Sequence, residues 1–338
     1  MSASAAARAR TRVYLTIDTE FSIGGAFEAP AEREPIGAQN VLCDVQGRSE
    51  GLGFMLDAFA ASDLRATFFV EALQTAWFGD EPMGALARRI AAAGHDVQLH
   101  LHPVWTWFDR ADWRERLKTE TPNDRMHGCS VEQLVERMQR GMAALQRWGI
   151  ARPVALRTGN LMVDRNVYKA MAEVGLRVAS NVARAVFEPA EEALRFNAGV
   201  HAIEGIIELP VLTYADLRLG GRTHRKVLTI TGSSFAETRA LLERAHRAGA
   251  PAVVLLTHCH EFVKGDMRGA LAANRVNQRR LTALCRYLRD ADDRYEVTTM
   301  DRVAGATTAA TSDALLGVPV HAALWRIAQN KLNDLNVI

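Results

Sequence analysis

The sequence predicts an α/β protein built from repeating strand–helix units, and three observations support this fold class. Short runs of β-branched and aromatic residues alternate with longer segments whose apolar residues recur at helical spacing. Strands separated by helices of this length pair in parallel, because the helix carries the chain back to the start of the next strand. Ionisable residues gather where the runs end, and the carboxyl ends of parallel strands form the active face of barrels built from such units.

The predicted strands are short and rich in Val, Ile, Leu, Thr, Tyr and Phe, as residues of a pleated, buried sheet usually are. The most apolar one lies late in the chain, as expected of a parallel strand covered on both faces. The segments are 13–17, 66–70, 96–101, 153–156, a strand that begins at Val178, 252–257 and 295–299.

The predicted helices have apolar residues three or four positions apart and recognisable start or stop signals. Ser130 followed by Gln133 forms a capping box at the start of one of them, and Gly94 and Gly249 are stop signals for two others. The helical patterns lie around Leu52–Phe59, around Leu86–Ala93, and over 130–148, 235–248 and 271–288.

Two regions and the two ends depart from this alternation. Residues 21–48 are polar and rich in Gly and Pro, which predicts a long loop after the first strand. Residues 194–230 indicate strands and turns, hence a β-rich insertion. We therefore predict a flexible N-terminus at 1–12, a single barrel domain over 13–305, and a helical extension over 306–338 that packs on the barrel or on a second subunit.

Composition excludes several classes of function. The 41 Lys and Arg residues nearly balance 39 Asp and Glu residues and form no long basic run, so nucleic acid is not an expected partner. No apolar segment follows 1–12, and no stretch is long and apolar enough to span a bilayer, so we expect neither a cleaved secretory signal nor a membrane span. The four cysteines form no CxxC pair, which is typical of reduced thiols in a cytoplasmic protein.

Two carboxylates stand at the end of the first predicted strand. Alternate residues of a strand share a face, so Asp18 and Glu20 project in the same direction. Such a pair can divide the roles of metal ligand and general base, although a solvated strand end would look the same.

Two histidines end the third predicted strand. His100 and His102 share a face at a spacing of about 6.6 Å along the strand, which lets two imidazoles converge on one ion. Pro103 then ends the strand. His95 precedes the same strand and belongs at the opposite end of the barrel, where we expect a structural role.

The remaining two groups follow the fourth and sixth predicted strands. Arg157, beside Gly159, can reach inward to a carboxylate and orient it, or it can lie on the surface. The apolar strand 252–257 ends in His258, His260 and Glu261, which is typical of a buried strand that delivers acid–base groups to a site; a surface cluster is the alternative.

In this order, the segments resemble the polysaccharide deacetylases of the NodB homology type, carbohydrate esterase family 4. The likeness runs from about Val13 to about Val303 and implies a distorted (β/α) barrel of about seven parallel strands. The matching segments are 16–20 (first motif, Asp-x-Glu variant), 66–70 (Ala-Thr-Phe-Phe), 94–103 (His motif), Arg157 with Gly159 (Arg motif), 207–210 (Glu-Leu-Pro) and 255–262 (Leu-x-x-His, continuing like His-Pro-Trp-Glu-Phe).

The resemblance also implies a chemistry: removal of an N-acetyl or N-formyl group from an amino sugar with one divalent metal ion, Zn²⁺ by expectation. Glu20, His100 and a second His would hold the ion. Asp18 would be the general base, tethered by Arg157, and His258 would protonate the leaving amine.

The sequence departs from the family pattern at two places. The usual position of the second metal-binding His is Val104, so His102 is the expected ligand, as in the Leu-His-x-His-Pro variants associated with lipopolysaccharide biosynthesis; His95 and His260 are the alternatives. The segment 178–181 lacks the Asp that usually orients the catalytic His, and Glu261 or Asp216 could take its place.

Two other functions fit parts of the pattern. Binuclear amidohydrolase barrels also use His-x-His, but on their first strand, whereas two strand–helix units precede it here. An inactive glycan-binding barrel would not need Asp18, Arg157 and His258 together. For a cytoplasmic deacetylase of surface-polysaccharide assembly, the expected substrate is a nucleotide-linked, lipid-linked or oligosaccharide form of an acylated amino sugar. The sequence does not decide whether the protein forms a homo-oligomer.

Overall fold

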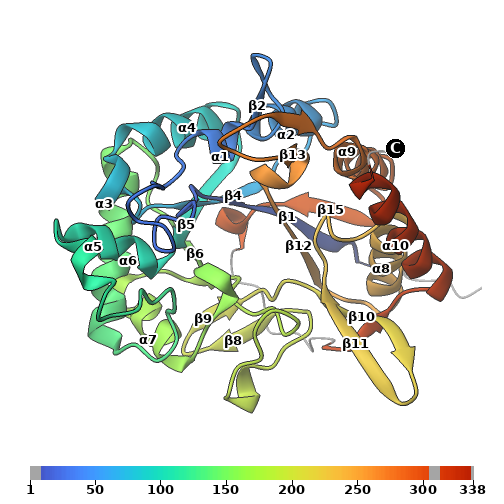
Figure 1. Ribbon diagram of the computed structural model, residues 1–338. Coiled ribbons are helices and arrows are strands. Elements are labelled where there is room, and N and C mark those ends of the chain that lie inside the picture. Colours follow the sequence, from blue (N-terminus) through green and yellow to red (C-terminus); the bar gives the residue numbers. More distant parts are fainter. Residues whose placement is uncertain (1–8, 304–312, 336–338) are drawn as a thin grey trace, which may run out of the picture.

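The computed structural model describes residues 9–303 and 313–335, and a nine-stranded sheet forms its centre (Figure 1). All neighbouring strands of this sheet are parallel except β8 and β9, as expected from the strand–helix alternation. The strand order is β12 (Ala252–His258), β1 (Thr11–Thr19), β4 (Thr67–Glu71), β5 (Asp96–Leu101), β6 (Ala155–Thr158), β7 (Val178–Ala179), β9 (Ile206–Glu208) and β8 (His201–Ile203), with β15 (Tyr295–Thr298) also paired to β1.

The two ends of the sheet are brought together by short segments that follow β9. Val211 and Thr229 form parallel bridges to Val254 and Leu256 of β12. The amide of Leu212 also donates to the carbonyl of Val254 at 3.1 Å. The sheet therefore curves into a barrel whose last gap is closed by irregular chain, and the predicted distorted α/β barrel is confirmed.

Helices cover the left, upper and right sides of the barrel in Figure 1. Ser130 and Ser234 form complete capping boxes at the starts of α6 and α8, and Asp164 caps α7, a helix that is not among those predicted from the sequence. The helices are α1 (Gln39–Leu42), α2 (Leu52–Ala60), α3 (Thr75–Phe78), α4 (Glu81–Ala92), α5 (Trp113–Arg116), α6 (Val131–Arg147), α7 (Arg165–Val174), α8 (Phe235–Arg247), α9 (Arg275–Asp290) and α10 (Val320–Asp334).

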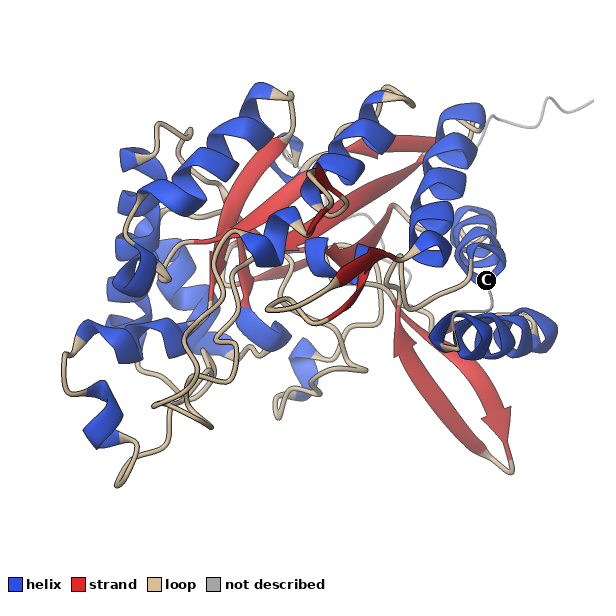
Figure 2. Ribbon diagram, turned by 45° about the horizontal axis from the view of Figure 1, so that its top comes forward, coloured by secondary structure: helices blue, strands red, loops and turns tan. Residues whose placement is uncertain are grey.

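The remaining strands form small sheets outside the central nine-stranded sheet. The hairpin of β10 and β11 projects away from the barrel in Figures 1 and 2, within the predicted β-rich region. Residues 271–273 pair as a strand instead of opening a helix, and α9 begins at Arg275 because Asn274 caps it. The strands are β2 (Asp44–Val45), β3 (Arg48–Ser49), β10 (Thr213–Leu219), β11 (Arg222–Val227), β13 (Val263–Gly265), β14 (Leu271–Ala273) and β16 (Leu316–Gly317).

Two separate apolar clusters follow from the alternation of the strands. Odd-numbered residues of β1, such as Leu15, pack in the large cluster that includes the helices, whereas Tyr14 packs in a smaller cluster with even-numbered residues of β12, such as Val254. In β5, Leu99 likewise joins the large cluster. The other face of each strand therefore points into the barrel, and its last inward positions are available for polar side chains.

The structure describes only part of the chain over which the three segments were predicted. β1 begins at Thr11, two residues before the predicted strand. Residues 1–8, and the predicted boundary between 305 and 306, lie outside the described residues, so the division into three segments stays a prediction. Within 9–303 and 313–335, no helix is long and apolar enough to cross a membrane.

The packing generates a stability prediction. Leu255 in β12 is fully buried, whereas Leu324 on α10 is 57% exposed. We expect Leu255→Ala to lower the free energy of unfolding by about 2–5 kcal/mol, because the truncation leaves a cavity. Leu324→Ala, the matched control, should change it by less than about 0.5 kcal/mol. Urea unfolding of both variants measures this, and equal losses would contradict the assignment of the core.

Candidate metal centre and active site

The proposed acid, base, tether and first histidine ligand (His258, Asp18, Arg157 and His100) lie on the barrel-facing side of β12, β1, β6 and β5. Leu99 and Leu255 pack outward against the helices, so His100 and His258, one and three positions further on, point inward. Asp18 lies opposite His258 in the register of β1 and β12, and His100 lies opposite Arg157 in the register of β5 and β6. Four segments that are far apart in sequence thus meet at one end of the barrel.

Glu20, His100 and His102 form a compact group of metal-ligating side chains. Their ligand atoms all lie within 4.8 Å of one another. Oε2 of Glu20 is 3.2 Å from Nε2 of His100 and 2.8 Å from Nε2 of His102. The predicted spacing therefore does bring the two imidazoles and the carboxylate together.

Both imidazoles of this group are held by their other ring nitrogen. Nδ1 of His100 is 2.8 Å from the carbonyl oxygen of Arg157, which can only accept, so Nδ1 carries the proton. Nδ1 of His102 is 2.6 Å from Oδ2 of Asp124. Each Nε2 is then left as the coordinating atom, the arrangement typical of histidine metal ligands.

The charges of the group fit a cation at its centre. Burial raises the pKa of Glu20, but the charge and hydrogen bonds of His102 and His100 outweigh it and hold this pKa well below its usual value. Burial lowers the pKa of His102, but the carboxylates of Glu20 and Asp124 outweigh it and raise this pKa well above its usual value. The carboxylates of Glu20 and Asp124 thus favour positive charge between them. A divalent ion on Glu20, His100 and His102 would supply this charge.

Two carboxylates of the site were not anticipated from the sequence. Asp124 lies in the irregular stretch between α5 and α6, where no periodic signal marks it. Glu71 ends β4 and is fully buried; its carboxylate accepts hydrogen bonds from the backbone amides of Leu73, at 2.6 Å, and of His102. A carboxylate directly after an apolar strand is the same signal that identified Asp18, so Glu71 could have been found.

The surroundings of Glu71 favour the uncharged, protonated form of its carboxyl group. Burial raises the pKa of Glu71 to about 7, although the charges of His102 and His100 act in the opposite direction. The carboxyl group fixes the backbone where β5 ends and therefore positions His102.

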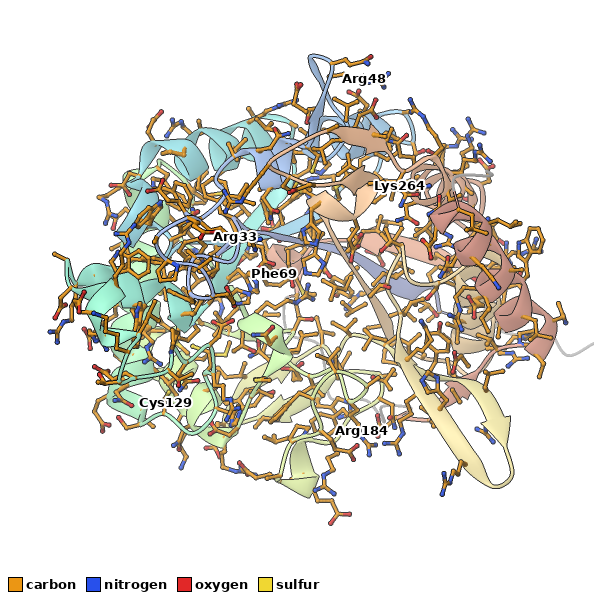
Figure 3. The ribbon with its side chains drawn as sticks, in the orientation of Figure 1. Arg33, Arg48, Phe69, Cys129, Arg184 and Lys264 are labelled. Carbon is orange, nitrogen blue, oxygen red and sulfur yellow. The ribbon has the colours of Figure 1, made fainter. Side chains whose placement is uncertain are left out.

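Arg157 is fully buried and occupies the middle of the site. Nη1 donates to Oδ1 of Asp18 at 2.8 Å and to Oγ1 of Thr16 at 2.9 Å. Nε and Nη2 donate to the carbonyl and hydroxyl oxygens of Ser180 at 3.0 and 2.7 Å. Its guanidinium carbon lies 4.4 Å from the ring centroid of Phe69, which Figure 3 shows near the middle of the barrel. The sequence-predicted contact between Arg157 and a carboxylate is present.

His258 is placed between two carboxylates. Nε2 of His258 is 3.9 Å from Oδ2 of Asp18, and Nδ1 is 3.2 Å from Oε1 of Glu261. Glu261 also accepts from the amide of His258 at 3.1 Å and from the hydroxyls of Thr231 and Thr257, both at 2.6 Å. Of the two residues suggested to orient His258, Glu261 therefore makes the contact.

Asp216, the other candidate for this role, is engaged elsewhere. Its carboxylate contacts Arg326 at 2.7 Å and His224 at 2.5 Å.

Glu261 and His258 also control each other's charge. Burial raises the pKa of Glu261, but the hydrogen bond and charge of His258 outweigh it and lower this pKa to about 2. Burial lowers the pKa of His258, but Glu261, with smaller contributions from Asp18 and Glu20, raises it to about 9. At neutral pH the pair is an imidazolium held by a carboxylate.

The two alternative histidines lie in different places. The ring of His260 is 5.1 Å from that of His258, and its pKa is lowered by burial and by the charge of His258. His95 lies at the start of β5, where Nδ1 accepts from the amide of Ala66 at 3.2 Å, and burial lowers its pKa to about 4. His260 thus borders the site, whereas His95 lies at the opposite end of the strand.

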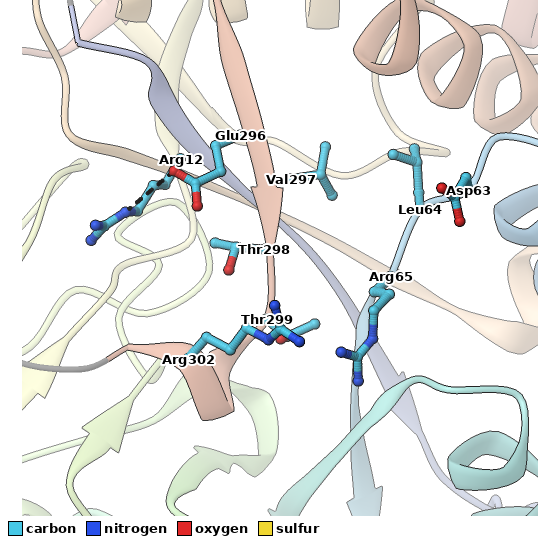
Figure 4. Close-up of a pocket in the computed structure, with 9 residues that line it drawn as sticks. All are labelled: Arg12, Asp63, Leu64, Arg65, Glu296, Val297, Thr298, Thr299 and Arg302. Carbon is cyan, nitrogen blue, oxygen red and sulfur yellow. Dashed lines mark ion pairs between the residues drawn. The ribbon is translucent and has the colours of Figure 1, made fainter. Parts of the chain in front are cut away.

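A pocket of about 530 Å³ gives access to the metal-ligating group. Glu20, His102, Asp124 and His260 supply its polar wall, with Ile23, Trp105 and Met267 among its apolar lining. A second pocket of about 240 Å³ is lined by the starts of β1 and β4 and by β15, with Arg12, Arg65 and Glu296 in its wall (Figure 4). That pocket lies at the opposite end of the strands from His100 and His258.

Comparison with known proteins gives a family match for part of the chain and a shared fold. Residues 46–179 match the sequence model of the polysaccharide deacetylase family. A solved structure from Mycobacterium smegmatis, described as a polysaccharide deacetylase, is 17% identical, with a TM-score of 0.53 over 89% of this chain and 91% of that one. A family 4 carbohydrate esterase from Streptomyces lividans is 14% identical, with a TM-score of 0.41 over 86% and 93%. No curated protein matches in sequence.

Residues 46–179 therefore match the polysaccharide deacetylase model, and the barrel has the NodB-type fold of the solved deacetylase-like structure. The resemblance stated from the motifs is confirmed at this level. The likeness to variants of lipopolysaccharide biosynthesis stays a prediction.

The geometry predicts the order of metal affinities. We expect one divalent ion per chain, released by His100→Ala and by His102→Ala, because each removes a ligand. Asp124→Asn should keep the site but weaken it by about 10–100-fold, since it removes the carboxylate that orients His102. Competition with a chromophoric chelator measures the affinities. Full metal affinity in the His102 variant would mean that another residue is the third ligand, and His260 is the next candidate. His95→Ala is the control, because His95 lies at the other end of the strand.

Proposed function

We propose that the protein is a metal-dependent hydrolase that removes an N-acetyl or N-formyl group from an amino sugar. The single observation that carries this proposal is the short distance of 3.9 Å between Asp18 and His258, beside the Glu20–His100–His102 group. A base, an acid and a metal-ligating group on one barrel end, in a polysaccharide deacetylase domain, are the parts that amide hydrolysis needs.

The metal-ligating group fits a catalytic ion better than a structural one. Glu20, His100 and His102 offer three protein ligands, and catalytic Zn²⁺ sites keep further positions open for water and substrate. When bound, such an ion acts as a Lewis acid toward the acyl carbonyl and makes water more acidic.

Asp18 is proposed as the general base. Oδ1 of Asp18 is held by Arg157 at 2.8 Å, which fixes the plane of the carboxylate. Oδ2 is then the oxygen that can accept a proton from the attacking water, and it faces His258. Arg157 is a positioning residue in this scheme, since its donors are engaged with Asp18, Thr16 and Ser180.

His258 is proposed as the general acid. Glu261 holds Nδ1 and keeps the imidazole protonated at neutral pH, because the pKa of His258 is raised to about 9. Nε2 is directed toward Asp18 and can deliver a proton to the departing amine. Amide hydrolysis needs this proton, because an amine anion is a poor leaving group.

The alternatives are less well supported. Among the described residues, one group of three or more metal-ligating side chains converges, which favours a single ion over a binuclear amidohydrolase centre. The case for an inactive glycan-binding barrel depended on the missing fourth-motif Asp, and Glu261 provides a carboxylate for His258 instead. We keep nucleotide-linked, lipid-linked and oligosaccharide acylamino sugars as substrates to be tested, in surface-polysaccharide assembly.

The proposed activity predicts acid release. We expect acetate or formate from an acylated amino sugar, lost with a chelator and restored by Zn²⁺ or Co²⁺. Asp18→Asn should retain the metal and lose at least about 10²-fold in kcat, since it removes a positioned base. Asp301→Asn, outside the site, is the control. If a panel of nucleotide-linked, lipid-linked and free acylamino sugars releases no acid, the result would favour an inactive glycan-binding barrel.

The pairing of His258 with Glu261 predicts a pH effect. His258 acts in its protonated form, so kcat/KM should fall as pH rises through its pKa of about 9. Glu261→Gln removes the carboxylate that raises this pKa, and the alkaline limb should therefore move to lower pH. Glu120→Gln, on an exposed ion pair, should leave the limb in place. An alkaline limb that does not move in the Glu261 variant would exclude His258 as the acid.

A further inference from the structure

Helix α10 packs on the protein through its polar side. Arg326 is buried and donates to Asp216 at 2.7 Å and to Glu237 at 3.1 Å. Gln329 and Asn330 accept from the guanidinium of Arg280 at 2.7 Å each. The small residues Ala322 and Ala323 are also buried, so polar contacts and alanines make this interface.

The opposite side of α10 exposes large apolar residues. Among the other residues whose exposure the structure describes, Val186 is the single exposed large apolar residue. A surface helix ordinarily buries its apolar stripe and exposes its polar face, and α10 does the reverse. A contiguous exposed apolar patch of this kind marks an interaction site. The exposed residues are Val320 (59%), Leu324 (57%), Trp325 (56%), Ile327 (44%), Leu332 (36%) and, capping the helix, Leu335 (64%).

The helices beside α10 concentrate the positive charge of the chain. Helices α8, α9 and α10, called the helical wall here, lie together on one side of the barrel (Figure 1). They contain ten Lys and Arg residues and four Asp and Glu residues, a net charge of +6 in a chain whose total is +2. Two of the acidic residues, Asp290 and Asp334, are exposed. The exposed basic residues are Arg239, Arg247, Arg275, Arg279, Arg286, Arg289 and Lys331.

We propose that the helical wall docks on the surface of an anionic lipid bilayer, with the apolar side of α10 in the interface. An amphipathic helix with Leu and Trp on one side, flanked by Arg and Lys, binds such surfaces through apolar burial and attraction to anionic headgroups. Trp325 suits this position, because an indole ring favours the boundary between headgroups and acyl chains.

Charge favours the bilayer over a second copy of the chain. A two-fold symmetric dimer places the same patch on both subunits, so two walls of net charge +6 would face each other. Like charges brought together across an interface oppose association, whereas an anionic surface complements them.

The docked helix would lie close to the candidate active site. Nζ of Lys264 donates to the carbonyl oxygen of Asn333, at the end of α10. Val263 and Gly265, on either side of Lys264, line the pocket that opens to Glu20 and His102. Docking would thus hold this pocket beside the bilayer. A lipid-linked sugar is then the favoured substrate, and this second step rests on the proposed function.

Vesicle sedimentation tests the docking without any assay of activity. We expect the full chain to bind vesicles of equal parts phosphatidylcholine and phosphatidylglycerol, and to bind vesicles of phosphatidylcholine alone far less. The double variant L324E/W325E should lose at least about tenfold in apparent partition coefficient, since both side chains would leave the interface. R286E/R289E should also bind less, and added salt should weaken the binding of the unaltered chain. V186E, the matched control on the other exposed apolar residue, should bind like the unaltered chain.

Several results would overturn the proposal. Failure of the unaltered chain to bind anionic vesicles would do so, as would equal binding by L324E/W325E with an unchanged circular dichroism spectrum. Sedimentation velocity that shows a dimer dissociated by L324E/W325E would assign the patch to a second copy instead. None of these results depends on deacetylation, so a failed docking test and a failed activity test remain distinguishable.

Discussion

The buried ion pair between Arg157 and Asp18 is the interaction on which the rest of the site depends. A guanidinium with no exposed surface is tolerated only when its donors and charge are satisfied. Here Nη1 donates to Asp18 and Thr16, and Nε and Nη2 donate to Ser180. These partners come from β1 and from the segment after β7, so one side chain joins distant strands across the barrel. Removal of Asp18 or Arg157 would leave its partner as an uncompensated buried charge, which is far more costly than loss of a surface pair.

The same residue links the two halves of the proposed chemistry. The guanidinium of Arg157 fixes Asp18, while its backbone carbonyl accepts from Nδ1 of His100 and so sets the tautomer of that imidazole. The other two imidazoles are each held by a carboxylate, His102 by Asp124 and His258 by Glu261. The three imidazoles and the carboxylate of Asp18 are therefore each held by a hydrogen bond at an atom that the proposed chemistry does not use. Little reorganisation would be required when a substrate arrives.

The sequence predicted the features that follow from strand periodicity and failed where geometry is irregular. A period of two places Asp18, His100 and His258 on inward faces once the apolar neighbours face the helices, so this part of the site needed no structure. Asp124 lies in a loop whose position only tertiary folding decides. The reversed orientation of α10 was equally hidden, because an amphipathic pattern does not say which side meets the protein; the ion pairs of Arg326 decide it.

The departure at residues 178–181 also has a physical explanation. Glu261 lies three residues after His258 on a single helical turn, and it accepts from Nδ1 and from the amide of His258, so a local carboxylate does what a distant one would otherwise do. The segment after β7 is thereby released for other contacts: Ser180 holds Arg157, and the side-chain oxygen of Asn181 accepts from the amide of Thr158 at 2.9 Å. Orientation of His258 then depends on β12, on the turn that follows it and on Thr231, which donates to Glu261, while the segment after β7 stabilises the arginine that orients Asp18. A change in one of these supports should leave the other intact, which ties the acid and the base to separate parts of the fold.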